Sequence, residues 1–253
     1  MLAQRSQILF AALTLFFLAA CGSASDADPQ VIIDRAMAAH GSENLDQAEV
    51  EFDFRDRHFV VTRDEGRFTY ERTFTDSTGA DVRDVLTNDS LYREVNGERV
   101  ELTEEERLSA ETGVNSVVYF ALLPYFLNDA AVQKRYLGEA TIEGEPYDKV
   151  EVTFQEEGGG QDYQDRYVYW FHQDNHTMDY LAYSFEVNGG GTRFRQAVNP
   201  RVVGGVRFAD YLNGGADTLG TPIHRYDDML AAGEIDPISE IELKNIDVRP
   251  LTP

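Results

Sequence analysis

The fold is decided first by the stretch Ile142–Phe154, which reads IEGEPYDKVEVTF. Its first half predicts the end of one strand and a tight turn around Gly144. From residue 149 to 154 apolar side chains alternate with Glu151 and Thr153, a period of two that is typical of a strand with one buried and one wet face. The stretch therefore predicts an antiparallel hairpin.

The same alternation extends outward in both directions. It recurs at residues 50–54 and 68–74, and Asn96-Gly97 between two apolar runs is a strong short-range signal for a hairpin. Residues 167–171 are apolar on both faces, which predicts a strand covered on both sides. The last strand changes parity at Lys244-Asn245, which predicts a β-bulge. Counting gives about nine or ten antiparallel strands.

Two helical segments are expected. Pro29 in a first turn, with Asp28 as cap, predicts an N-terminal helix that ends at Gly41. Thr103-Glu104-Glu105-Glu106 has the form of a capping box and opens a helical stretch toward residue 127, which Gly113 divides into two helices on one interpretation. Its end, residues 117–127, is eleven consecutive apolar residues, too short to span a bilayer. This segment is either a core helix or the lid of an apolar cavity.

Composition and charge exclude several classes of protein. The chain of 253 residues has 45 acidic against 22 basic residues, a net charge of -23, which repels nucleic acid. Common catalytic and phosphate-binding motifs are absent, and carboxylates are so abundant that their presence identifies no acid and base. The sequence therefore predicts a non-enzyme without cofactor, with an acidic solvating surface. His172 and His176 flank Asp174 at a predicted turn, and we assign no metal to them.

The N-terminus has the pattern of a secretory signal, with an apolar run too short to span a bilayer. Leu18-Ala19-Ala20-Cys21 resembles the lipobox of bacterial lipoproteins. The resemblance implies cleavage after residue 20 and lipidation of Cys21. The small and acidic residues that follow predict a flexible tether over residues 21–28, and the lack of a second linker predicts one domain over residues 29–253. Gly22 is not the Asp that retains such proteins in the inner membrane, which favours the outer membrane, on its periplasmic face or the cell surface.

The hairpin at residues 142–154, the N-terminal helix, the meander and the helical insertion together resemble the LolA/LolB-like superfamily of envelope lipoproteins, above all its uncharacterised members. The resemblance implies an α+β fold in which a strongly curved antiparallel sheet forms an incomplete β-barrel. The N-terminal helix and the helical insertion would cover its concave face, and the apolar interior would accept acyl chains.

The sequence and this resemblance predict an anchored, monomeric envelope lipoprotein that binds a lipid or other hydrophobic ligand. A non-catalytic interaction protein with a filled core and an envelope protein as partner is the main alternative, and a hydrolase is a further one. If a ligand is bound, the expected cavity lining comes from the insertion and the sheet: Val118, Phe120, Leu122, Leu123, Tyr125, Phe126, Phe52, Tyr70, Tyr169 and Phe171.

Overall fold

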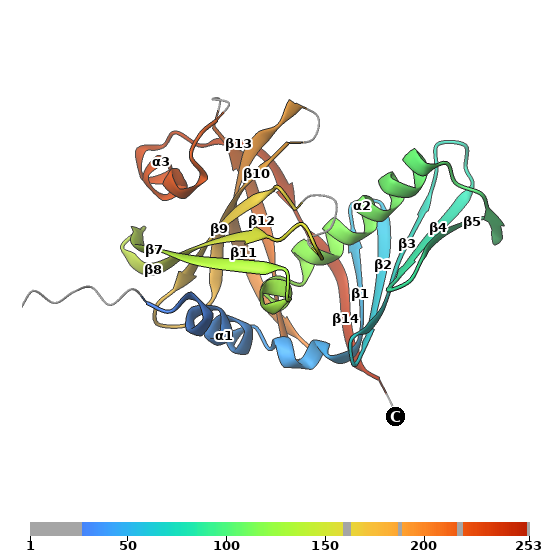
Figure 1. The fold of residues 1–253 in the computed structure, drawn as a ribbon, viewed down its shortest axis with the longest axis horizontal. Helices are drawn as coiled ribbons and strands as arrows, with labels where there is room; N and C mark the ends of the chain where they lie inside the picture. Colours follow the sequence, from blue (N-terminus) through green and yellow to red (C-terminus); the bar gives the residue numbers. More distant parts are fainter. Residues whose placement is uncertain (1–26, 159–162, 187–188, 217–219, 252–253) are drawn as a thin grey trace, which may run out of the picture.

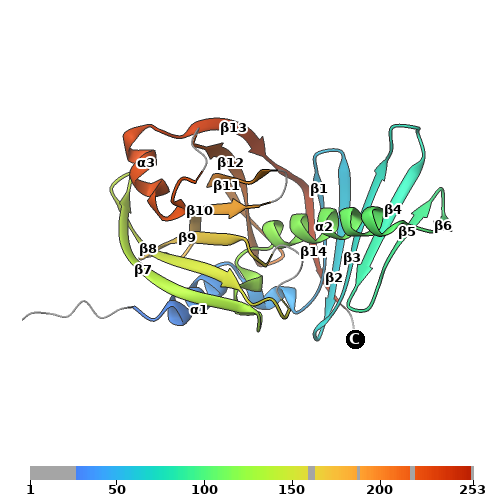
Figure 2. The same cartoon turned by 45° about the horizontal axis from the view of Figure 1, so that its top comes forward.

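The computed structural model describes residues 27–158, 163–186, 189–216 and 220–251. Within them the chain forms two seven-stranded antiparallel sheets, with strand orders β14-β1-β2-β3-β4-β5-β6 and β13-β12-β11-β10-β9-β8-β7. We call these sheet A and sheet B. In Figures 1 and 2 they lie side by side, and α2 extends from their junction across one face of sheet A.

The strands of sheet A are β1 (Gln47–Phe54), β2 (Arg57–Asp64), β3 (Arg67–Thr75), β4 (Asp81–Thr87), β5 (Leu91–Val95), β6 (Glu98–Val100) and β14 (Leu243–Pro250). Those of sheet B are β7 (Val132–Ile142), β8 (Glu145–Phe154), β9 (Arg166–His172), β10 (Met178–Phe185), β11 (Gly191–Val203), β12 (Val206–Gly215) and β13 (Asp236–Ile241). The helices are α1 (Pro29–Ala39), α2 (Glu104–Ala121) and α3 (Tyr226–Ala232), with short 3-10 turns η1 (Ser42–Leu45), η2 (Tyr125–Asn128) and η4 (Ile223–Arg225).

The antiparallel α+β fold is as predicted, but two sheets take the place of a single curved one. Only Glu242 separates β13 from β14. At this point the N–H of Leu243 donates to Asp210 Oδ1 (3.0 Å), and its carbonyl accepts a hydrogen bond from Arg201 Nη2 (2.5 Å). Side chains thus satisfy the backbone groups that would have continued the ladder with β12. The pairing with β12 ends here, and the following segment, β14, pairs with β1 of sheet A instead.

Local signals for turns, caps and bulges are confirmed. The Asp28 side chain caps α1, and Thr103 with Glu106 forms the capping box of α2. β5 and β6 flank Asn96-Gly97. The β-bulge in β14 lies where Asn245 has a φ of 51° and the register with β1 shifts. These features depend on a few neighbouring residues, which is why the sequence alone reveals them.

The predicted division of the insertion at Gly113 is wrong, because α2 continues through this residue. A Cβ at Gly113 would lie 2.1 Å from Arg72 Nη1. The glycine lets the helix pack closely over the arginine of β3. After α2 the chain passes through Pro124 into η2, so the apolar segment is a helix end, a short connection and a 3-10 turn.

The core lies in three clusters. One fills the space between sheet A and α2, and a second lies between α1, η2 and one face of sheet B. The third lies between the other face of sheet B and α3. In β9, Tyr167 and Tyr169 belong to the second cluster while Val168 and Trp170 belong to the third. The prediction that this strand is covered on both faces is therefore confirmed.

Candidate functional site

Two recesses flank the tip of the β1–β2 hairpin, and Arg55 in its turn borders both. The larger, about 650 Å³, lies where β1 to β5 begin or end at one edge of sheet A, and we call it the strand-end groove. The smaller, about 400 Å³, lies between the hairpin, α2 and sheet B, and we call it the inter-sheet cavity. Both volumes fall in the range of small-molecule sites, about 300–1,000 Å³.

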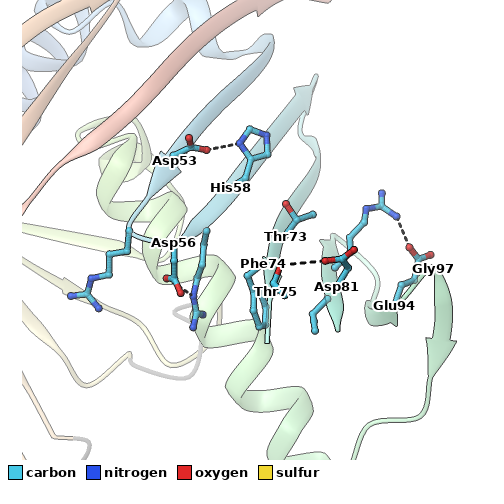
Figure 3. A pocket seen from close by; sticks show the side chains of 13 residues that line it. Asp53, Asp56, His58, Thr73, Phe74, Thr75, Asp81, Glu94 and Gly97 are labelled. Atoms are coloured by element: carbon cyan, nitrogen blue, oxygen red, sulfur yellow. Dashed lines mark hydrogen bonds and ion pairs between the residues drawn. The ribbon is translucent and has the colours of Figure 1, made fainter. Parts of the chain in front are cut away.

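Charged groups of the strand-end groove pair with one another (Figure 3). Arg83 Nη1 lies 2.9 Å from Glu94 Oε2, and Arg83 Nε lies 2.8 Å from Glu71 Oε2. Arg57 pairs with Asp56 at 3.7 Å. Arg83 and Arg57 thus each have a carboxylate of the chain beside them, whereas Arg55, which borders this groove as well as the cavity, has none in the described residues.

The groove also holds a carboxylate–histidine pair that sequence reasoning missed. Asp53 Oδ1 lies 2.7 Å from His58 Nδ1, and Asn245 Nδ2 donates to Asp53 Oδ2 at 2.6 Å. The hydrogen bond from Asn245, followed by that from His58, lowers the pKa of Asp53. A two-residue turn at Arg55-Asp56 places positions 53 and 58 opposite each other, so recognising that turn would have revealed the pair.

The inter-sheet cavity has aromatic and aliphatic walls. Val117, Phe120 and Ala121 face it from α2, and Tyr167 and Tyr183 face it from sheet B. The Phe120 ring centroid lies 5.4 Å from that of Tyr183 and 6.2 Å from that of Tyr167. The two tyrosine rings stack on each other at 5.7 Å. These separations are typical of packed aromatic side chains, so the wall is a continuous apolar surface.

The polar groups of the cavity are mainly arginines. Arg55, Arg193 and Arg195 belong to its lining, together with Asp165. Tyr211 lies deeper, where burial raises the pKa of its phenol to about 12. The phenol is therefore neutral at physiological pH, and the arginines carry the positive charge of the site.

Arg195 lies closest to the aromatic wall. Its guanidinium carbon is 4.1 Å from the Phe120 ring centroid and 5.1 Å from that of Tyr183, and Nη2 donates to the Tyr183 hydroxyl at 3.0 Å. Its Nε is buried and has no hydrogen-bond acceptor. Arg193 lies over Phe185 and Arg55 over Phe54, at 5.1 and 5.0 Å. Across the described ranges, no carboxylate lies within 4.0 Å of any of these three guanidinium groups.

The ten residues predicted to line a ligand cavity separate into two sets. Phe120 borders the inter-sheet cavity. The other nine lie within or against the packed clusters between the elements: Val118, Leu122, Leu123, Tyr125, Phe126, Phe52, Tyr70, Tyr169 and Phe171. Tyr125 is held there by Arg63, whose Nε donates to its hydroxyl at 2.9 Å. Most of the apolar segment thus anchors α2 and η2, and only one predicted side chain reaches the cavity.

Sequence reasoning also missed the arginines, because it looked for apolar lining alone. A signal was present in β11, where Arg193 and Arg195 flank Phe194. Phe194 is buried in the cluster under α3, so the alternation of a strand turns both arginines toward the opposite face. That face of the sheet is covered as well. Charged side chains rarely lie on a covered face, so two arginines there indicate a polar binding site.

Two other predictions concern positions outside this cavity. Cys21, the predicted lipidation site, lies outside the described residues, as do the lipobox and most of the tether. His172 is buried at the end of β9, where its Nδ1 accepts a hydrogen bond from the N–H of Asp174 (3.1 Å). No helix within the described ranges is both long enough and apolar enough to cross a membrane.

A family model described as a family of unknown function, DUF6503, matches residues 7–242. This chain belongs to that family. No curated protein matches it. The match covers sheet B, α2 and every strand of sheet A except β14, and it includes all residues that line the inter-sheet cavity except Leu243.

Among solved structures, the chain is similar to the LolA superfamily protein NE2245 from Nitrosomonas europaea, with 12% identity and a TM-score of 0.49 over 88% of this chain and 94% of that one. It is similar to a DUF1329 family protein from Desulfovibrio piger, with 12% identity and a TM-score of 0.49 over 87% and 93% of the two chains. The lipoprotein LppX from Mycobacterium tuberculosis matches with 15% identity and a TM-score of 0.29 over 65% and 91%. Each of these similarities is at low sequence identity and concerns the fold alone.

Proposed function

We propose that this protein is a membrane-anchored envelope lipoprotein that binds one lipid or other hydrophobic ligand in the inter-sheet cavity. The observation that carries the proposal is the aromatic wall formed by Phe120, Tyr167 and Tyr183 around a recess of about 400 Å³. Each methylene group that leaves water for such a wall contributes about 0.8 kcal/mol. The cavity is large enough for a single small-molecule ligand.

The anchor belongs to the proposal as well. Cys21 would carry the lipid, and the short segment before α1 would tether the domain to the envelope, with the outer membrane favoured. Intact-mass analysis of the N-terminal peptide from membrane fractions tests this. The wild-type peptide should begin at Cys21 and carry acyl groups, whereas the Cys21→Ser protein should lack them. An unmodified wild-type N-terminus would contradict the anchor.

Ligand binding is tested with the Cys21→Ser protein, so that the anchor's own acyl chains do not interfere. Native mass spectrometry should detect a copurifying lipid-sized ligand, and a fluorescent fatty-acid probe should bind with saturation. Val117→Trp places a larger side chain in the cavity from the α2 side, and it should abolish both signals. Phe120→Ala removes part of the wall and should weaken binding of the probe.

A matched control variant is Phe74→Ala, which removes the phenylalanine that lines the strand-end groove. It should leave binding of the probe unchanged. Melting curves of all variants show whether the protein stays folded. The proposal would be wrong if a folded Val117→Trp protein still bound the probe. It would also be wrong if the wild-type protein contained no ligand and bound no probe.

A non-catalytic interaction protein is the second candidate. Leu212 in β12 and Ile238 in β13 are 42% and 51% exposed, and they border a further recess of about 390 Å³ beside α3. Exposed apolar side chains that gather around a recess are typical of protein–protein contacts. Capture of one defined envelope protein, lost in an Ile238→Asp variant and retained in Val117→Trp, would favour this function over ligand binding.

A further inference from the structure

The charge of the inter-sheet cavity is opposite to that of the chain as a whole. Acidic residues outnumber basic ones by 45 to 22, yet Arg55, Arg193 and Arg195 meet around this recess with Asp165 as the acidic residue of the lining. A random distribution of side chains in so acidic a protein would place carboxylates there. The cavity is thus a local positive site on a negative molecule.

Many arginines elsewhere in the described ranges have carboxylate partners, although Arg63 and Arg99 lie over tyrosine rings instead. Arg72 and Arg93 share Asp84, and Arg201 pairs with Asp210 at 2.9 Å. Arg207 lies 3.3 Å from Asp179. The three cavity arginines instead lie over aromatic rings without such a partner in the described residues.

Arg195 shows most clearly where an anion would lie. One edge of its guanidinium is satisfied through the Tyr183 hydroxyl, but its Nε is buried and lacks an acceptor. A buried donor without an acceptor is unfavourable. A shift of the side chain toward the cavity would let a carboxylate or phosphate oxygen satisfy Nε, and the planar guanidinium is suited to bind both classes of oxyanion.

The geometry points to a ligand that combines an anion with an apolar chain. We propose that the cavity selects single-chain amphiphiles with an anionic head, a carboxylate or a phosphate monoester. The head contacts Arg195, Arg193 and Arg55 complete a positive rim, and the chain lies against Phe120 and Tyr167. This inference rests on the proposed function and names the class of ligand for the same cavity.

The test compares amphiphiles that share one chain and differ in the head. Dodecanoate and dodecyl phosphate are titrated against dodecanol, each below its micelle concentration, into the Cys21→Ser protein, with affinity measured by displacement of the fluorescent fatty-acid probe. The anionic ligands should bind at least about tenfold more tightly than the alcohol, a difference of about 1.4 kcal/mol. Acetate and inorganic phosphate at millimolar concentration should not displace the probe, because they lack the chain.

Substitutions assign the preference to the arginines. Arg195→Gln should reduce the ratio of anionic to neutral affinity to about one while dodecanol still binds, and Arg195→Lys should restore part of the ratio. The matched control is Arg99→Gln. Arg99 also lies over an aromatic ring, 3.8 Å from the Tyr92 centroid, but in sheet A and outside the lining of the cavity. Its substitution should leave the ratio unchanged.

Each outcome decides a different question. Equal affinity for anionic and neutral amphiphiles in the wild-type protein would overturn the inference and leave the proposed function standing. A preference that persists in Arg195→Gln would also overturn it, because the head would then contact other groups. If none of the three amphiphiles binds, the proposed function and the inference fail together. Displacement of the probe by inorganic phosphate alone would show a free anion site instead of an amphiphile site.

Discussion

The two halves of α2 cover arginines in opposite situations. Near its middle, Gly113 packs on Arg72, which shares the fully buried Asp84 with Arg93. The distances are 2.5 Å from Arg72 Nη2 and 2.6 Å from Arg93 Nε to the carboxylate oxygens. Near its C-terminal end, Phe120 packs on Arg195, which has no carboxylate beside it in the described ranges.

The difference separates a structural role from a binding role. A buried arginine that the chain itself neutralises contributes to the fold, and its loss leaves an unpaired charge. An arginine beside a recess keeps part of its hydrogen-bonding capacity for a ligand. Burial lowers the pKa of Arg72, and its hydrogen bond with Asp84 opposes this change. The same residue type thus has two different environments under the same helix, and the proposed function assigns a binding role to Arg195 alone of the two.

The largest expected effect is the loss of the shared carboxylate. Asp84→Ala leaves the buried Arg72 and the partly buried Arg93 together without an anion, which should lower the free energy of unfolding by about 3–5 kcal/mol. Chemical denaturation followed by circular dichroism measures it. Asp81→Ala, in the exposed part of the same strand, is the control and should cost less than about 1 kcal/mol. Equal losses in the two variants would contradict the prediction, because they would mean that α2 does not shield Arg72, Asp84 and Arg93 from water.

The buried His40 beside Arg207 allows a prediction of how the stability of the protein depends on pH. Burial, and then the charge of Arg207, lower the pKa of His40 to about 3, and its Nε2 accepts a hydrogen bond from the N–H of Met178. The unfolded chain binds a proton at this position below about pH 6.5 and the folded protein does not. Stability should therefore fall as pH decreases from about 6.5 to about 3, by at most about 1.4 kcal/mol per pH unit from this group.

His40→Gln provides the matching measurement, because glutamine can still accept a hydrogen bond but does not titrate. The difference in unfolding free energy between wild type and variant should shrink with falling pH in this window. Carboxylates titrate equally in both proteins and cancel in the difference. A difference that stays constant from pH 7 to pH 4 would show that His40 is protonated in the folded protein.

A smaller effect is expected from the cavity arginine. Arg195→Gln removes contacts with Phe120 and Tyr183 but leaves no carboxylate unpaired, so the free energy of unfolding should change by at most about 1 kcal/mol. Arg72→Gln, which takes a partner from Asp84, should cost about 3 kcal/mol. The two variants carry the same chemical change under the same helix. Similar losses for both would erase the distinction between paired and unpaired arginines.

The smallest effect is expected in the strand-end groove. Arg83 there pairs with both Glu94 and Glu71, and the hydrogen bond with Glu71 is the main cause of its raised pKa. Its side chain is 37% exposed, so solvent screens these pairs. Glu94→Gln should therefore change stability by less than about 1 kcal/mol and leave amphiphile affinity unchanged. A change in affinity would show that the groove, too, takes part in binding.

Several parts of the fold could be predicted because short-range chemistry determines them. Asp28, Thr103 and Glu106 satisfy backbone groups within a few residues of themselves, and a cap has this function wherever its helix packs. The parity change at Asn245 marks a bulge in any strand of alternating burial. The apolar pattern of residues 167–171 likewise requires cover on both faces.

The sequence could not predict which side chains of an apolar run lie in the packed core and which line the cavity. Phe120 and Phe126 lie six positions apart in one apolar run, and nothing local distinguishes a cavity wall from a packed core. Phe126 is 7% exposed in the cluster under sheet A, whereas Phe120 packs beside Tyr183 in the wall of the cavity. The number of sheets was also hidden, because the strand break depends on Asp210 and Arg201, far from Leu243 in sequence.

The sequence by itself determined the antiparallel α+β elements, their caps and turns, the covered strand β9 and the lipobox-like segment before the domain. It could do so because each depends on periodicity or on interactions between near neighbours. Only the tertiary structure decided that the strands form two sheets, that Phe120 borders a cavity and that Arg195 lies beside it without a carboxylate. Those outcomes depend on where α2 lies between sheets A and B, and contacts between residues distant in sequence set that position.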